Sequence, residues 1–371
     1  MNQNHVTKPH YEILNGLRGI AAIIIVAFHV YEAYTINPFD QIFNHAYLAV
    51  DFFFVLSGFV IGYAYDERWG KMSLGNFLKR RLFRLHPMVV FGTLLGACLF
   101  YFGASTIFPL ISDIPVWKLL VFTLLGMFLI PTPPNMDIRG WQEMYTLDAP
   151  IWSLFYEYIA NILYGLFIRK FTKTALSVLV FLAACAISYQ ALTQGDMIVG
   201  WEFSGHHLRV GFTRLIYPFF AGLLMYRIGK MIHIRQAFLW SSLALIVALT
   251  APRIGGEDTL WMNGLYEAFI VIIFFPLIVL TGAGGEVKNK FSLKACKFLG
   301  DISYPLYLVN YPLCYIHIGW LSDTKYTFAE AWWVSAGVFI ASIVLAYLAL
   351  KLFDEPIRKR LNKYRLNTQK C

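Results

Sequence analysis

Apolar residues occur along this chain in long blocks that are separated by short polar segments. Each block has about 17 to 25 residues, enough for a helix to cross the hydrocarbon core of a bilayer, which is about 30 Å thick. About eleven apolar stretches can be drawn, centred near residues 23, 56, 95, 123, 160, 182, 220, 245, 272, 312 and 341. The pattern predicts an all-α protein, a polytopic bundle of transmembrane helices.

Lys and Arg in the loops between the blocks predict the orientation of the helices, because basic loops stay in the cytoplasm. The basic loops are residues 66–86, 169–173, 227–235, 288–297 and 358–360. The loops between them carry about one basic residue each, and we expect them to face outward; these residues are Arg139, Arg209, Arg253 and Lys325.

This alternation fails at one place, between residues 87 and 131. The stretches 87–103 and 114–130 must together make a single crossing, and the shorter stretch 114–130 is the weaker candidate to span. We therefore expect about ten spans, with both termini in the cytoplasm. The loops are too short for a second domain and no long-period repeat is present, so residues 1–371 are predicted to form one membrane-embedded domain.

Composition agrees with this class, since 58% of the residues are hydrophobic and only 14% are charged. The net charge of +9 comes from the cytoplasmic loops, which is a topology signal, so we expect no nucleic-acid partner. The five cysteines include no CxxC pair, and the adjacent His206 and His207 lack a third ligand at regular spacing, so neither a disulfide framework nor a metal site is predicted. The first apolar block lacks a clear cleavage site and is expected to be a retained span rather than a signal peptide.

Two ionisable residues, Arg18 and His29, lie in the first apolar block. Charges in hydrocarbon cost at least about 2.5 kcal/mol each on insertion scales, so such residues indicate function unless they reach an interface. Arg18 is near the cytoplasmic end and could simply extend to the surface, whereas His29 lies too far along the helix to reach that side. Their spacing corresponds to about three turns and about 16 Å, so the two side chains share one helical face and one extended ligand could contact both.

Two acids are predicted at about the depth of His29. Asp51 is a few residues into the second block, and Glu157 is about two turns into a later block, with Ser153 on the same helical face. A carboxylate beside a histidine fixes its tautomer and stabilises the imidazolium, which is the usual arrangement of a general base. Asp51 could instead be a helix-start charge that the helix dipole favours. The hypothesis is catalysis by His29, with Glu157 or Asp51 orienting it.

A basic cluster, Lys79, Arg80, Arg81 and Arg84, precedes the third block. It serves as a topology anchor in any case. Arg80 and Arg84 are one helical turn apart, however, and paired guanidinium groups suit phosphate recognition. The cluster is therefore a candidate site for a phosphorylated ligand from the cytoplasm.

Several familiar catalytic motifs are missing, since the sequence has no GxSxG, no GxxxxGK[ST] and no HExxH. From the residues alone, the buried charges fit an enzyme and a transporter equally well. In the transporter, Arg18, His29, Asp51 and Glu157 would form a proton or substrate relay. A sensor or scaffold without turnover leaves these charges poorly explained.

An ordered set of motifs resembles the acyltransferase-3 family of integral membrane O-acyltransferases across nearly the whole chain. The motifs are Arg18 and His29 at their spacing, DFFFVLSGF (51–59), RRLFRLHP (80–87), WSLFYE (152–157), ISYPLYLVNYP (302–312) and DEPIRKRL (354–361). The resemblance implies transfer of an acyl group, usually acetyl, from cytoplasmic acyl-CoA to a hydroxyl of a surface carbohydrate. Some members act on antibiotics or other small molecules, and that acceptor class stays an alternative.

The resemblance also implies roles for single residues. The histidine that matches His29 is catalytic, and the arginines that match Arg18, Arg80, Arg81 and Arg84 serve the acyl-CoA donor. The same motifs make Trp152, Ser153, Tyr304 and Asn310 candidate substrate-binding residues. Many relatives have a histidine where this chain has Asn310, which can hydrogen-bond but cannot titrate, so no role of that histidine is carried over.

These observations together predict a multi-pass acyl-CoA-dependent O-acyltransferase of the inner (plasma) membrane. We expect acetyl-CoA or another acyl-CoA as donor substrate, no permanently bound cofactor, and a carbohydrate or lipid-linked glycan as acceptor. His29 would remove the proton of the acceptor hydroxyl, and an acyl-histidine intermediate is the alternative. Some members of the family carry an additional periplasmic hydrolase-like domain; we expect none in these 371 residues, so that the membrane domain or another protein would complete the reaction.

Overall fold

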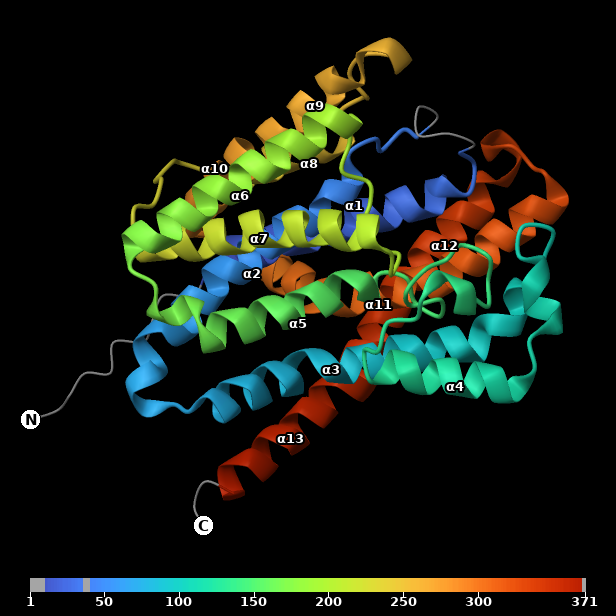
Figure 1. The fold of residues 1–371 in the computed structure, drawn as a ribbon, viewed down its shortest axis with the longest axis horizontal. Coiled ribbons are helices and arrows are strands. Elements are labelled where there is room, and N and C mark those ends of the chain that lie inside the picture. Colours follow the sequence, from blue (N-terminus) through green and yellow to red (C-terminus); the bar gives the residue numbers. More distant parts are fainter. Residues whose placement is uncertain (1–10, 36–40, 369–371) are drawn as a thin grey trace, which may run out of the picture.

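The computed structural model describes residues 11–35 and 41–368, and within these ranges the chain is helical without any strand (Figure 1). The predicted all-α class is confirmed. The α-helices are α1 (Glu12–Glu32), α2 (Ala49–Tyr65), α3 (Leu74–Leu99), α4 (Val116–Met127), α5 (Ile151–Leu166), α6 (Lys173–Gln194), α7 (Gly205–Ile228), α8 (Ala237–Thr250), α9 (Leu260–Phe269), α10 (Phe275–Gly284), α11 (Lys290–Thr324), α12 (Phe328–Ala349) and α13 (Glu355–Thr368).

Helices long and apolar enough to cross a membrane make up much of this bundle. Among the described residues there are 7 such segments: Glu12–Glu32, Ala46–Lys71, Leu74–Gly103, Lys173–Gln194, Gly205–Ile228, Glu257–Gly284 and Phe328–Lys363. Two further apolar helices, α4 and α8, are shorter. The chain is therefore a multi-pass membrane protein, while the count of about ten spans stays a prediction.

The region from α3 to α4 contains the pair of stretches that the basic-loop rule could not assign. The segment Leu74–Gly103 is 30 residues long, whereas α4 has only 12 residues. A helix of that length rises about 18 Å, well short of the roughly 30 Å bilayer core. This difference agrees with the expectation that stretch 114–130 is the weaker spanner.

Glycines allow α1 to lie directly against α11. A Cβ on Gly19 would be 2.4 Å from Cβ of Leu299, and a Cβ on Gly300 would be 2.6 Å from Cβ of Asn15. Small residues at such contacts let two helix backbones approach closely, which favours association inside a membrane. The face of α1 that carries Arg18 is consequently held against α11.

A second close contact joins α2 to α7. A Cβ on Gly58 would be 1.8 Å from the carbonyl oxygen of Phe219, and a Cβ on Gly222 would be 2.1 Å from that of Val55. The two glycines therefore face the partner backbone from opposite sides of the interface. This contact brings α7 beside the start of α2, where Asp51 lies.

Two prolines, Pro305 and Pro312, interrupt the hydrogen bonding of the long helix α11. Proline has no N–H, so the carbonyl groups of Asp301 and Leu308 have no donor four residues later in the helix. Asn310 lies between the two prolines and is fully buried. The motif 302–312 thus forms an irregular central section of α11, where side-chain contacts to α1 are made.

Candidate active site

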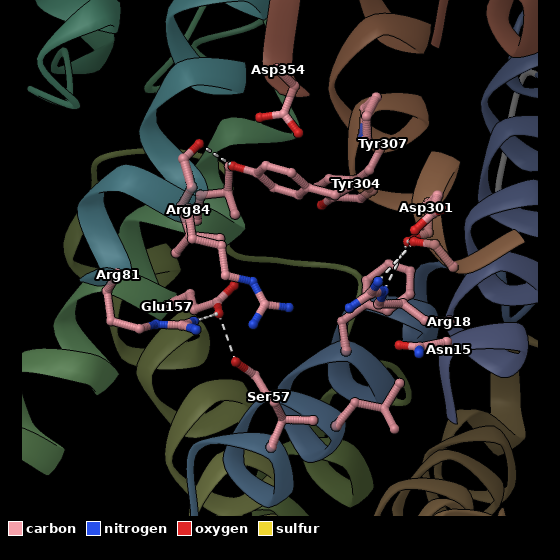
Figure 2. A pocket seen from close by; sticks show the side chains of 18 of the residues that line it. Asn15, Arg18, Ser57, Arg81, Arg84, Glu157, Asp301, Tyr304, Tyr307 and Asp354 are labelled. Atoms are coloured by element: carbon pink, nitrogen blue, oxygen red, sulfur yellow. Dashed lines mark hydrogen bonds and ion pairs between the residues drawn. The ribbon is translucent and has the colours of Figure 1, made fainter. Parts of the chain in front are cut away.

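A cavity of about 680 Å³ lies between α1, α2, α3, α5, α11 and the C-terminal helices (Figure 2). Charged residues of both signs line it. The basic ones are Arg18, Arg80, Arg81, Arg84, Lys297 and Arg358, and the acidic ones are Glu12, Glu157, Asp301, Asp354 and Glu355. We call it the inner cavity, because the basic loops predicted to be cytoplasmic lead into it.

Arg18 contributes a fixed guanidinium group to the wall of the inner cavity. Its Nε donates to the hydroxyl of Ser303 at 2.8 Å, and one terminal nitrogen donates to the carbonyl of Gly300 at 2.8 Å. Both partners belong to α11, so the close packing of α1 on α11 sets its direction. Arg18 therefore lines the cavity and is not a side chain that only extends to a membrane surface.

The predicted arginine cluster of α3 reaches the same cavity from the opposite wall. Figure 2 shows Arg81 and Arg84 coming from α3, across the cavity from Arg18. Arg84 makes no ion pair with any described residue, and Arg80 also lines the cavity. The sequence thus correctly predicted that these arginines gather in one place. Tyr304 lies at the same wall, where its hydroxyl donates to the carbonyl of Leu85 at 2.6 Å.

Glu157 lies in the inner cavity, not beside His29. Its Oε1 accepts from Arg81 at 2.7 Å and from the hydroxyl of Ser57 at 2.6 Å (Figure 2). The expected contact between Glu157 and His29 is therefore wrong. Counting turns along α5 placed Glu157 in the outer half, but the inner cavity reaches that depth and supplies an arginine as a closer partner. Glu157 instead holds Arg81 in place.

A second cavity, of about 370 Å³, contains His29 and lies toward the other end of α1. We call it the outer cavity, because the loops predicted to face outward close over it. Its lining is mainly aromatic, with two acids: Phe28, His29, Glu32, Tyr47, Trp141, Glu143, Trp152, Trp201, Tyr307 and Tyr311 are among its residues. His29 and Trp152, the candidate substrate-binding residue, thus line the same cavity.

Asn310 determines how His29 is protonated. The amide nitrogen of Asn310 donates to the carbonyls of Leu306 and Tyr307, at 2.9 and 2.8 Å. Its Oδ1 must then face Nδ1 of His29, at 2.9 Å, and can only accept. We therefore assign the proton to Nδ1, which leaves Nε2 of His29 with a free lone pair, as a general base requires.

Asp51 does not contact His29 either. It is fully buried, and its carboxylate forms an ion pair with Arg214, with a shortest distance of 2.6 Å. Arg214 is on α7, so the glycine contact between α2 and α7 makes this pairing possible. The expectation that Asp51 orients the histidine is wrong, because its carboxylate is taken up by Arg214, and no spacing along the chain links these two residues.

Two acids of the outer cavity were not identified from the sequence, Glu32 and Glu143. Glu32 follows His29 by three residues on α1, so the same helical spacing that joined Arg18 to His29 could have identified it. Glu143 lies in the irregular segment before α5, where no periodicity predicts its direction. It is only 4% exposed and accepts a hydrogen bond from Tyr315. Burial raises the pKa of Glu143 to about 8.

The two cavities meet in the middle of the bundle. Val50 and Tyr307 line both, and both are buried. The hydroxyl of Tyr307 is 2.9 Å from that of Ser153, the predicted substrate-binding residue, which lines the inner cavity. A single layer of side chains therefore separates the basic cavity from the one that holds His29.

Comparison with known proteins identifies relatives of the whole chain. It is 28% identical to the O-acetyltransferase OatA of Staphylococcus aureus over 94% of its length, and 24% identical to the putative peptidoglycan O-acetyltransferase YrhL of Bacillus subtilis over 95%. Over 41% of its length it is 36% identical to "Protein 2 in picA locus" of Rhizobium radiobacter, covering 80% of that protein.

The chain spans only a little more than half of the two O-acetyltransferases, 57% of OatA and 56% of YrhL. No solved structure matches it. The family model described as an acyltransferase domain matches residues 11–351, which include the whole lining of the outer cavity and that of the inner cavity except its C-terminal residues. This multi-pass chain belongs to the acyltransferase-3 family.

Proposed function

We propose that the protein is a membrane O-acyltransferase that moves an acyl group, in the simplest case acetyl, from cytoplasmic acyl-CoA to a hydroxyl of a cell-surface carbohydrate or its lipid-linked precursor. One observation carries the proposal: a basic cavity and a cavity with a correctly oriented histidine meet at Tyr307. A reaction between an anionic donor from one side and a neutral acceptor from the other needs such an arrangement.

The donor is assigned to the inner cavity. Arg80 and Arg84 offer guanidinium groups for the phosphates of CoA, and Arg81 is held at their side by Glu157. Arg18 lies deeper, and an extended pantetheine arm could pass it to bring the thioester toward His29, about 16 Å further along α1. The arm would have to displace the Tyr307–Ser153 hydrogen bond on its way.

His29 is the general base of the proposed reaction. The acceptor hydroxyl gives its proton to Nε2 as its oxygen attacks the thioester carbonyl, so that a C–O bond forms. The C–S bond then breaks, and the CoA thiolate takes the proton from the imidazolium. The products are the O-acyl ester and free CoA, and His29 returns to its neutral form. Asn310 holds the ring in the required tautomer throughout.

The acceptor is assigned to the outer cavity. Trp141, Trp152 and Trp201 line it and offer flat apolar surfaces on which sugar rings can pack. The name of one relative, a putative peptidoglycan O-acetyltransferase, agrees with a cell-surface glycan, and the name of another, an O-acetyltransferase, agrees with transfer of an acetyl group. The basic loops predict that the inner cavity faces the cytoplasm, where acyl-CoA is found, and that the outer cavity faces outward, so the proposal places the chain in the inner (plasma) membrane.

The proposal is tested with the purified full chain, radiolabelled acetyl-CoA and lipid-linked glycans. We expect label on an acceptor, or slow release of CoA without one. His29→Ala should lower the rate by about 10²- to 10⁴-fold, the usual contribution of a general base, and leave CoA affinity unchanged. His206→Ala, at an exposed histidine, is the matched control. A near-normal rate in His29→Ala would refute the assigned role, and label on the protein without acceptor would indicate an acyl-histidine.

Donor binding is tested separately by calorimetry with CoA. Arg84→Ala should weaken binding by about tenfold or more, since a hydrogen bond to a charged group contributes about 1.5–3 kcal/mol. Arg84→Lys should restore only part of the lost CoA affinity, because an ammonium group cannot bind phosphate in a bidentate way. Arg68→Ala, at an exposed arginine outside the cavity, is the control. If a folded Arg80/Arg81/Arg84 triple-Ala variant bound CoA as tightly as the parent protein, these arginines would serve only as topology anchors.

A further inference from the structure

The acids of the outer cavity bear on which acceptors the protein can use. We infer that the cavity selects an uncharged polyhydroxyl acceptor and rejects anionic sugars, with Glu32 and Glu143 as the specificity-determining residues that accept its hydroxyl hydrogens. This inference rests on the proposed function, because it concerns the acceptor of that reaction.

Glu32 is one helical turn beyond His29 and lines the same cavity. Its Oε2 is buried and has no hydrogen-bond partner among the described residues. A buried carboxylate oxygen without a partner is costly unless a ligand or water donates to it. An acceptor hydroxyl beside His29 would supply that donor.

Glu143 belongs to the segment before α5 and lines the same cavity. One of its oxygens, Oε2, accepts from the hydroxyl of Tyr315, which leaves Oε1 for a second donor. Whether protonated or ionised, a carboxyl group has an oxygen that can accept from a hydroxyl. The two acids therefore offer acceptor positions on two sides of a polyol.

Among the residues that the structure describes, none that lines the outer cavity offers a free cation to an anionic ligand. Arg214 lines it, but its Nε is bonded to Asp51 and its two terminal nitrogens donate to the carbonyls of Val199 and Tyr47, each at 3.0 Å, and again to Asp51. Arg139 lies 3.5 Å over the ring of Tyr315 and does not line the cavity. His29 uses its one N–H on Asn310.

An anionic sugar would therefore bring its carboxylate or phosphate next to two acids without a cation to balance it. A charge buried without a partner where water is excluded is costly whether or not the two carboxyl groups are ionised, and an ionised Glu32 or Glu143 adds repulsion between like charges. A neutral sugar has no such penalty, and its hydroxyls match the acceptor oxygens present. The aromatic walls add contact area that does not depend on charge.

The test compares two tetrasaccharides of equal length, β-1,4-linked glucose and β-1,4-linked glucuronic acid, as ligands of the solubilised full chain. Saturation-transfer difference NMR measures binding without turnover, and labelled acetyl-CoA measures transfer to the same sugars. We expect the neutral tetramer to bind with a Kd at least about tenfold lower than that of the anionic tetramer, a difference of about 1.4 kcal/mol. In the Glu32→Gln/Glu143→Gln double variant the ratio should fall to within about threefold. Glu257→Gln, at an exposed outer-loop acid, should leave the ratio unchanged.

Each result supports or overturns the inference. Equal binding of the two tetramers, binding of neither, or a ratio that survives the double variant would overturn it. Failure of the proposed function looks different: the neutral tetramer would bind in a way that depends on the two glutamates, yet no labelled acetyl group would reach this sugar or any lipid-linked glycan, and CoA would not be released.

Discussion

His29 can act as a base only if its ring is held in one orientation and one tautomer. Asn310 provides both. Its amide nitrogen already donates to two carbonyl groups of α11, so its oxygen points at Nδ1 of His29 and accepts the hydrogen bond from that nitrogen. Those carbonyls belong to the section of α11 between its two prolines. A residue that cannot titrate thus determines which nitrogen of the histidine faces the substrate.

Asn310→Leu keeps the branched shape of the side chain but removes the oxygen that accepts from His29. We expect kcat to fall by about 10- to 100-fold, less than the full contribution of a general base, with an unchanged KM for acetyl-CoA. Steady-state kinetics with varied acetyl-CoA separates these quantities. Asn310→Asp should recover part of the loss, since a protonated carboxyl supplies both a donor and an acceptor. Equal losses in both variants, or a parallel rise in KM, would mean that Asn310 acts only through packing.

At the scale of helices, glycines determine which side chains can meet. The close approach of α2 and α7 puts Asp51 and Arg214 in contact, and that of α1 and α11 places Arg18 on Ser303. Without these contacts the charged residues would be buried without partners, which is expensive in a membrane. Close helix packing is therefore needed to position the charged side chains of the site, as well as to hold the fold together.

Gly222→Ala should test this dependence. Its new Cβ would lie 2.1 Å from the carbonyl oxygen of Val55, a backbone atom that cannot rotate away. We expect a loss of about 1–3 kcal/mol in stability, seen as a lower midpoint of thermal unfolding in detergent. Gly337→Ala is the matched control, because nothing lies within 4 Å of its Cβ position and alanine favours a helix. Similar midpoints for the two variants would show that α2 and α7 can separate without cost.

The sequence predicted the helices and the arginine cluster well, because hydrophobic blocks and basic loops depend on the bilayer alone. It predicted the partners of the acids poorly. Depth along a helix can be counted, but the direction of Asp51 and Glu157 depends on Arg214 and Arg81, which come from helices far apart in the sequence. Glu143 could not be found at all, since its segment has no regular period.

For the whole molecule, the main feature is that two cavities of different chemistry are separated by Val50 and Tyr307. The inner one is lined by charged residues from α1, α3, α11 and the C-terminal helices, and the outer one by aromatic residues and two acids. The start of α1 and the residues of α13 around Arg358 line the same cavity, so these parts of the chain lie at one end of the bundle. Donor and acceptor would consequently approach from opposite sides.

Membrane vesicles of defined orientation test this arrangement, because acetyl-CoA is charged and does not cross a sealed bilayer. In inverted vesicles the basic loops face the added acetyl-CoA, and we expect label to reach glycan on the luminal side. In right-side-out vesicles we expect no label until the membrane is permeabilised, since the described lining of the outer cavity offers no free cation for the phosphates of CoA. The His29→Ala variant corrects both preparations for background. Strong labelling in sealed right-side-out vesicles would mean that the arginine-lined cavity opens outward, and the predicted orientation of the chain would have to be reversed.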